Sequence, residues 1–154
     1  GRTENEDRAH FTMWCMMASP LILGNDLRSM NEATRRIIMN KEMIAIDQDT
    51  LGIQGLHYCN HGALQFWFKP LRGGDWAFTI LNPTKKDITY ELNWQDFNLT
   101  DTQVSKLSTN FDTQVYKVYN LWTHKMEGKT SKKSKAERKL TIKAHDVIAY
   151  RLIR

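Results

Sequence analysis

The chain has only two cysteines in its 154 residues, and long apolar runs are missing altogether. Two cysteines, Cys15 and Cys59, cannot build the disulfide framework on which small secreted domains depend. No apolar run approaches the roughly 18 residues that a membrane span needs, so no membrane partner is predicted. The N-terminus lacks the charged-then-apolar layout of a signal peptide, and any such signal is expected upstream.

Motifs of common enzyme chemistry are also scarce. No Ser-His-Asp order or glycine-rich phosphate loop is present, and the sequence predicts no cofactor. The nearest approach to a metal motif is the alternation of His57, Cys59 and His61. On a regular strand these three side chains share one face, and zinc accepts both imidazole and thiolate. Because no fourth ligand lies nearby, we expect an ordinary strand, with metal binding as the alternative.

The positive charge is local. Residues 1–55 carry six Lys/Arg and eight Asp/Glu, a sum of −2, whereas residues 56–154 carry sixteen and nine, a sum of +7. The excess gathers around the Lys- and Ser-rich residues 129–135. This run lacks the aromatic side chains on which single-stranded nucleic acids stack. It therefore predicts a solvated hairpin loop and no nucleic-acid partner.

Residues 1–55 have the pattern of a helix, a strand and a helix. Thr3 and Glu6 form a capping box, and the helix is expected to run to about Ala18, with Phe11, Trp14 and Met17 on its buried face. The following segments are expected to be a buried strand at 21–23, a helix at 31–39 and a short apolar turn at 43–46. This arrangement is typical of part of an α/β enzyme.

From about residue 56 the apolar period changes to two, which indicates strands. Strand-like runs occupy residues 63–68, 76–81, 88–92, 115–119, 140–143 and 147–152. Turn signals such as Asn82-Pro83 separate them, and short strands at this spacing favour a sandwich or barrel. We therefore predict two units, residues 1–52 and residues 53–154, with the second mainly β.

Two stretches carry a family resemblance. The first, "GRTENEDRAHFTMWCMMASPLILGNDLRSM" with "IIMNKEMIAIDQDTLGIQG", resembles "HFxxWxxMxxPLxxxNDLR" and "EVIAINQDxLGxQG" of the α-galactosidases (melibiases, glycoside hydrolase family 27). The second, "YNLWTHKMEG" with "AHDVIAYRL", resembles "RDLWxHxxxG" and the closing strand of that family's C-terminal domain. The resemblance covers nearly the whole chain and is stronger before residue 55 than after it.

The resemblance implies a fold and an activity. Residues 1–52 would be the last helices and last strand of a (β/α)8 barrel, and residues 53–154 an antiparallel Greek-key β-sandwich. The family hydrolyses terminal α-galactosides with retention, by means of two aspartates on earlier barrel strands. Those strands are not in this sequence, so the resemblance implies no catalytic residue here and an isolated chain without activity. It also implies a secreted, periplasmic or lysosomal protein.

Few residues of the chain itself are candidates for a site. Asp26 would follow the barrel strand at its C-terminal end, where catalytic groups of barrels lie, although a turn role is the simpler interpretation. Asp47 and Asp49 could form a carboxylate pair, but a structural role is expected for them. Trp67 and Trp76 are expected in the core, and Trp94 is the best candidate for an exposed sugar-stacking ring.

Three functions are therefore open. The first is the C-terminal part of an α-galactosidase-type hydrolase, which acts on α-galactoside carbohydrate through the missing barrel. The second is a carbohydrate-binding sandwich without catalysis. The third is an assembly module, because the apolar helical face between Phe11 and Met17 would lack its barrel neighbours. We expect that face either to fold back on the sandwich or to pair with a second copy as a homo-oligomer.

Overall fold

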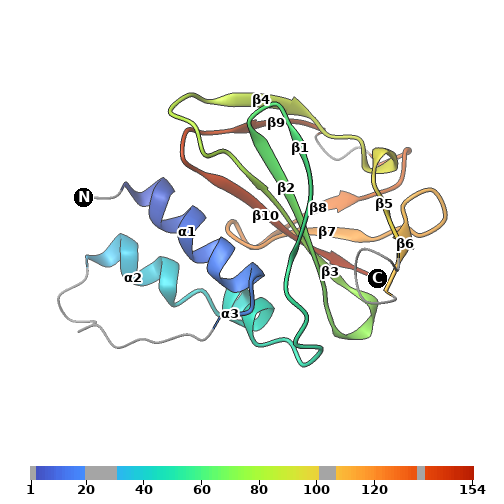
Figure 1. The fold of residues 1–154 in the computed structure, drawn as a ribbon, viewed down its shortest axis with the longest axis horizontal. Coiled ribbons are helices and arrows are strands. Elements are labelled where there is room, and N and C mark those ends of the chain that lie inside the picture. Colours follow the sequence, from blue (N-terminus) through green and yellow to red (C-terminus); the bar gives the residue numbers. More distant parts are fainter. Residues whose placement is uncertain (1–2, 20–30, 101–106, 135–137) are drawn as a thin grey trace.

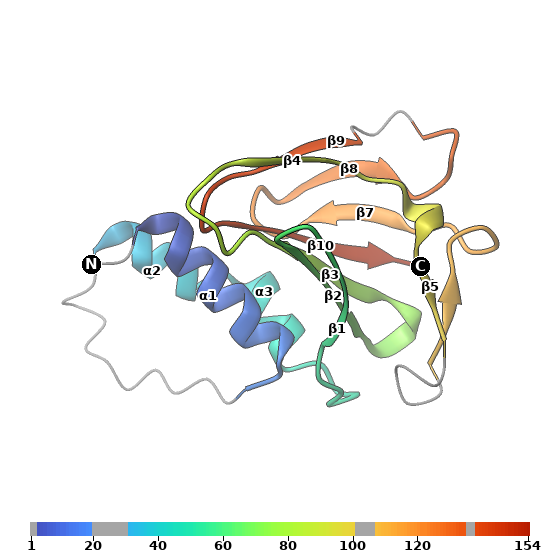
Figure 2. The ribbon, with the colours of Figure 1, turned by 45° about the horizontal axis from the view of Figure 1, so that its top comes forward.

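The computed structural model describes residues 3–19, 31–100, 107–134 and 138–154. These residues form three layers: a group of helices, a six-stranded sheet and a set of shorter strands (Figures 1 and 2). The strand expected at residues 21–23 lies outside the described residues. None of the described helices is both long enough and apolar enough to cross a membrane.

Three α-helices open the described chain: α1 (Glu4–Met16), α2 (Glu32–Ile38) and α3 (Lys41–Asp47). Thr3 caps α1 as predicted, since its hydroxyl accepts the Glu6 amide at 3.2 Å. Asn31 caps α2 in the same way and accepts the Thr34 amide at 2.7 Å. The segment expected to be a short apolar turn is the third helix, because Asn40 supplies a further N-cap.

The central sheet is antiparallel throughout, with strand order β1-β2-β3-β10-β7-β8. The six strands are β1 (Leu56–His61), β2 (Leu64–Pro70), β3 (Trp76–Leu81), β7 (Lys117–Asn120), β8 (Lys125–Lys129) and β10 (Val147–Ile153). The last strand returns to lie between β3 and β7, which is a non-sequential connection of the Greek-key kind. At the edge, β8 ends at Lys129, and the described residues 130–134 of the Lys- and Ser-rich run form bends and turns, as expected for a loop. Exposed lysines on an edge strand discourage pairing with other chains.

Short strands form the second layer of the sandwich. Two antiparallel pairs make it up: β4 (Ile88–Glu91) with β9 (Lys139–Ile142), and β5 (Asn98–Leu99) with β6 (Thr109–Asn110). Two 3-10 turns, η2 (Arg72–Gly74) and η3 (Trp94–Asp96), join strands. The predicted mainly β, antiparallel sandwich is therefore confirmed.

The central sheet buries both of its faces. On one face, Phe66, Phe68 and Phe78 belong to an aromatic core shared with the short strands. On the other face, Trp67 and its neighbours pack against α1 and α3, where Phe11 and other apolar helical residues are buried. Alternation along β2 sends successive side chains to opposite faces. The apolar side of α1 therefore folds back on the sandwich, which is one of the two outcomes that we expected.

Candidate functional site

The helices pack on one face of the central sheet, and this contact layer is here called the helix–sheet seam. It contains buried and half-buried polar side chains that link the helices to the strands. It joins α1, α3 and residues 48–55 to strands β2, β7 and β10 (Figure 2). Asn40 is central to it and is 7% exposed. Its amide group donates to the Leu121 carbonyl at 2.9 Å, while its Oδ1 accepts the amides of Glu42 and Met43 at 3.1 and 3.2 Å. One side chain thus caps α3 and ties it to the sheet.

A second set of contacts joins α3 to the turn between β7 and β8. The Glu42 carboxylate accepts hydrogen bonds from the Tyr119 hydroxyl at 2.8 Å and from the Nδ1 nitrogen of His124. The hydrogen bond and the carboxylate charge raise the pKa of Tyr119. Nearby, the Trp122 indole donates to the Thr12 hydroxyl at 2.9 Å, which links the same turn to α1.

An ion pair joins the start of α1 to the sheet. The Arg8 guanidinium donates to both oxygens of Asp146, at 3.0 and 3.1 Å, with both side chains largely buried. Bidentate pairing of this kind fixes orientation as well as distance. Asp146 directly precedes β10, so the pair anchors the helix to the central strand of the sheet.

At the other end of the seam a lysine is fully buried. Lys69 on β2 has no exposed surface, and its ammonium donates to the Ile53 carbonyl at 2.7 Å. Burial lowers the pKa of Lys69, while the carboxylates of Asp49 and Asp47 act in the opposite direction. Beside it the Gly55 amide donates to the Met16 carbonyl at 2.7 Å. These bonds fix the connection between the helical unit and the sandwich.

The structure gives Asp47 and Asp49 different environments. Asp49 has a structural role, as expected: Oδ1 accepts the amides of Leu51 and Arg72, each at 3.0 Å, and Oδ2 accepts the Arg72 amide at 3.1 Å. The Oδ1 atom of Asp47 is buried and has no hydrogen-bond partner among the described residues. Burial raises the pKa of Asp47, and Lys69 partly offsets that rise. Asp26, the third carboxylate considered, lies outside the described residues.

The expectation of an exposed Trp94 is wrong. Trp94 is 3% exposed, and its ring lies 5.0 Å from Phe78 and 5.6 Å from Phe111 between ring centroids. The reason is the 3-10 turn η3, which turns the indole inward onto the aromatic core; a polar local sequence gave no sign of this. Trp76 is buried as expected, and Trp67 is half-buried beneath the helices. An exposed aromatic platform built on Trp94 is therefore excluded.

The alternation of His57, Cys59 and His61 does not place three ligands on one face. The pairing of β1 with β2 shifts between His57 and Cys59, so that His57 lies opposite Trp67 and Cys59 opposite Phe66. Because adjacent residues of β2 face opposite ways, this bulge separates His57 from Cys59 and His61. The imidazole of His57 instead stacks on Trp67 at 4.6 Å. Within the described ranges, no group of three acidic, His or Cys side chains is arranged to hold a metal.

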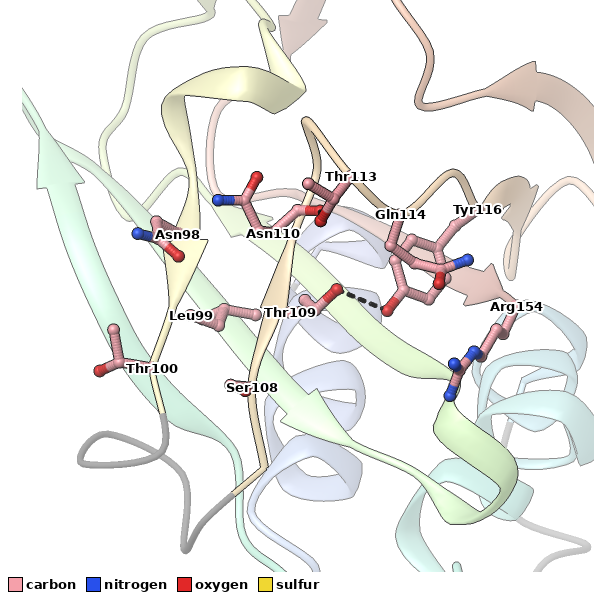
Figure 3. A pocket seen from close by; sticks show the side chains of 10 residues that line it. All are labelled: Asn98, Leu99, Thr100, Ser108, Thr109, Asn110, Thr113, Gln114, Tyr116 and Arg154. Carbon is pink, nitrogen blue, oxygen red and sulfur yellow. Dashed lines mark hydrogen bonds between the residues drawn. The ribbon is translucent and has the colours of Figure 1, made fainter.

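A polar groove of about 530 Å³ lies at β5 and β6, on the side of the sandwich away from α1 and α2 (Figure 1), and Figure 3 shows the side chains that line it. It is lined by Asn98, Leu99, Thr100, Ser108, Thr109, Asn110, Thr113, Gln114, Tyr116 and Arg154. At its wall the hydroxyls of Thr109 and Tyr116 are 2.7 Å apart and hydrogen-bonded. Among the described residues that line the groove, none has a carboxylate side chain, and Arg154 alone has a charged one. Such amide and hydroxyl groups can bind a hydroxyl-rich ligand, but they offer neither a nucleophile nor an acid for glycoside cleavage.

Sequence reasoning missed the polar residues of the seam. The sequence pattern alone predicts no role for Asn40, Glu42 or Lys69, although Asn40 stands directly before an acidic first turn, which is an N-cap signal. The buried position of Lys69 had a weaker signal, since Lys69 extends an apolar strand run. The contact of Glu42 with His124 spans 82 positions, and nothing in the local pattern of either segment indicates it.

Two family models match the chain, one to the helical segment and one to the sandwich. Residues 1–49 match the family described as "Alpha galactosidase A", and residues 61–152 match the "Alpha galactosidase C-terminal beta sandwich domain". The contacts of Arg8, Asn40 and Glu42 with the sheet thus join one matched part to the other.

Individual relatives agree with these matches. The chain is 41% identical over 152 residues to alpha-galactosidase A of Cellvibrio japonicus, covering 99% of this chain and 36% of the relative. It is 34% identical over 150 residues to the alpha-galactosidase of Coffea arabica, covering 97% of this chain and again 36% of the relative. The crystal structure of alpha-galactosidase I from Mortierella vinacea superposes with a TM-score of 0.78 at 27% identity, covering 99% of this chain and 36% of that one. The chain thus spans about a third of the length of these relatives. It belongs to the alpha-galactosidase family and contains the C-terminal β-sandwich domain of that family.

Proposed function

We propose that the 154 residues support the catalytic barrel of a retaining glycosidase that hydrolyses terminal α-galactosides, and that they do not themselves carry out the chemistry. The observation that carries this proposal is the helix–sheet seam. Its polar contacts hold α1 and α3 against the sandwich through Asn40, Glu42 and Arg8. On this proposal residues 1–52 are the end of the barrel, and residues 53–154 are the sandwich that fixes them.

The carboxyl groups of the described residues also support a non-catalytic role for this chain. Retention requires two carboxyl groups about 5–5.5 Å apart on either side of the sugar. Of the two carboxylates that we considered as a pair, Asp49 is occupied by backbone amides and Asp47 lies in the seam. The catalytic aspartates are therefore proposed to lie in the part of the relatives that this chain does not span.

Hydrolysis of a chromogenic α-galactoside tests the proposal. The isolated chain should show no turnover above buffer. A chimera in which these 154 residues replace the matching part of the Cellvibrio japonicus relative should hydrolyse the substrate, whereas that relative truncated before the same part should lose activity or solubility. Turnover by the isolated chain would refute the proposal and would make Asp26, Asp47 and Asp49 the first residues to mutate.

The polar groove favours carbohydrate binding by the sandwich as a second candidate function. Asn98, Ser108 and Arg154 are exposed there, and such groups donate to and accept from sugar hydroxyls. Titration of the ¹⁵N-labelled chain with galactose should shift the amide signals of residues 108–110 and 113–116. A variant with Asn98→Ala and Arg154→Ala should lose those shifts. Unchanged spectra at high millimolar galactose would exclude this function for galactose.

For the assembly alternative, we propose that the helical unit pairs with its own sandwich and not with a second copy. The buried side of α1 already packs on the sheet through Phe11, Cys15 and Met16. Met39 has an exposed fraction of 49%, and on this proposal it faces the rest of the barrel. Sedimentation equilibrium should give the monomer mass of 18.0 kDa, and a stable dimer would contradict this.

A further inference from the structure

One carboxyl oxygen in the seam is buried without a hydrogen-bond partner within the described ranges, on a side chain that is otherwise half-buried. The Oδ1 atom of Asp47 is buried and accepts no hydrogen bond among the described residues. An unpaired buried acceptor costs free energy, and the cost is larger when that acceptor carries charge. The position therefore favours a neutral side chain over an ionised one.

Two titratable groups interact electrostatically with Asp47: Lys69 from β2 and the Cys15 thiol from α1. Asp49, in the segment that follows α3, acts on the same lysine. The Lys69 ammonium donates its short hydrogen bond to the Ile53 carbonyl, and its charge acts on both carboxylates. One buried ammonium is thus shared between two carboxylates, and its attraction offsets only part of the cost of burying an ionised Asp47.

From this arrangement we propose that Asp47 makes the helix–sheet seam pH-responsive: the helices pack more stably on the sandwich when the Asp47 carboxyl carries a proton. A protonated carboxyl is neutral and gains an O–H donor. The acidic group at residue 47 is therefore the element on which the response depends.

The direction of the response follows from linkage. Burial raises the pKa of Asp47 in the folded chain above its ordinary value, so the folded state keeps this proton to a higher pH than the unfolded state does. The free energy of unfolding then falls as the pH rises from the ordinary aspartate pKa, near 3.9, through the raised folded value. Above the folded value the penalty is constant.

Urea unfolding of the full chain at pH 4.5 and pH 7.5 tests the proposal with two neighbouring substitutions. Asp47→Asn should raise the unfolding midpoint at pH 7.5, and this gain should shrink at pH 4.5. Asp49→Asn is the matched control: because both Asp49 oxygens accept backbone amides, it should lower the midpoint at pH 7.5. Opposite signs for two aspartates two positions apart are the expected signature.

A lower midpoint for Asp47→Asn at pH 7.5 would overturn the proposal, since it would mean that attraction to Lys69 outweighs the cost of burial. A gain of equal size at both pH values would overturn it as well. A second measurement does not depend on any variant. The ¹³C carboxyl signal of Asp47 in the unmodified chain should titrate at a higher pH when folded than when unfolded in urea, and equal titration midpoints would refute the idea.

Discussion

Replacing Asn40 by alanine removes two interactions of one side chain, and the free-energy cost of each can be worked out separately. Loss of the cap on α3 costs about 1 kcal/mol. Loss of the amide donor leaves the Leu121 carbonyl unpaired in a buried position, which costs a further 1–3 kcal/mol or so. Asn40→Ala should therefore lower the free energy of unfolding by about 2–4 kcal/mol, which moves the urea midpoint by about 1–2 M.

Asn31→Ala is the matched control because Asn31 caps α2 by the same kind of bond but is exposed, and its side chain makes no other hydrogen bond among the described residues. It should cost about 1 kcal/mol, the value of a cap alone. The difference between the two variants isolates the hydrogen bond across the seam. Equal losses for Asn40→Ala and Asn31→Ala, measured with the same slope of unfolding, would refute the view that Asn40 holds α3 to the sandwich.

Three further predictions concern single positions. Gly55→Ala should lower stability by about 1–3 kcal/mol and speed exchange of the residue-55 amide, because the added methyl would lie 2.8 Å from the Met16 carbonyl oxygen. Trp94→Ala should lower the free energy of unfolding by about 3–5 kcal/mol, since the indole fills the aromatic core. A thiol reagent at pH 8 should label exposed Cys59 and spare Cys15 in the folded chain, because burial and the nearby Asp47 raise the pKa of Cys15 to about 12.

Each of these predictions has a control in the chain. Gly52→Ala adds a methyl with no atom within 4 Å and only a positive φ to accommodate, so it should leave the exchange of the Gly55 amide unchanged. Trp14→Ala, at a ring that is 39% exposed, should cost less than Trp94→Ala. Cys59→Ser should abolish labelling of the folded chain, and labelling that persists would show that the Cys15 thiol is accessible.

Much of the local structure is predictable because it rests on contacts within a few residues. The caps at Thr3 and Asn31 are satisfied by amides three positions away. The alternation of residues 76–81 predicts β3 with the observed bounds. The two motif stretches identify the family, since they occur in order along the chain.

The sequence alone determined these local elements, the change of period near residue 56 and the family membership. Only the tertiary structure decided which side chains are buried and which meet. It turned Trp94 into the core, separated His57 from Cys59 by a bulge, and brought Asn40 to a carbonyl 81 positions away. The physical reason is that helix caps and strand alternation depend on near neighbours, whereas burial and the seam depend on strand register and on how the layers pack.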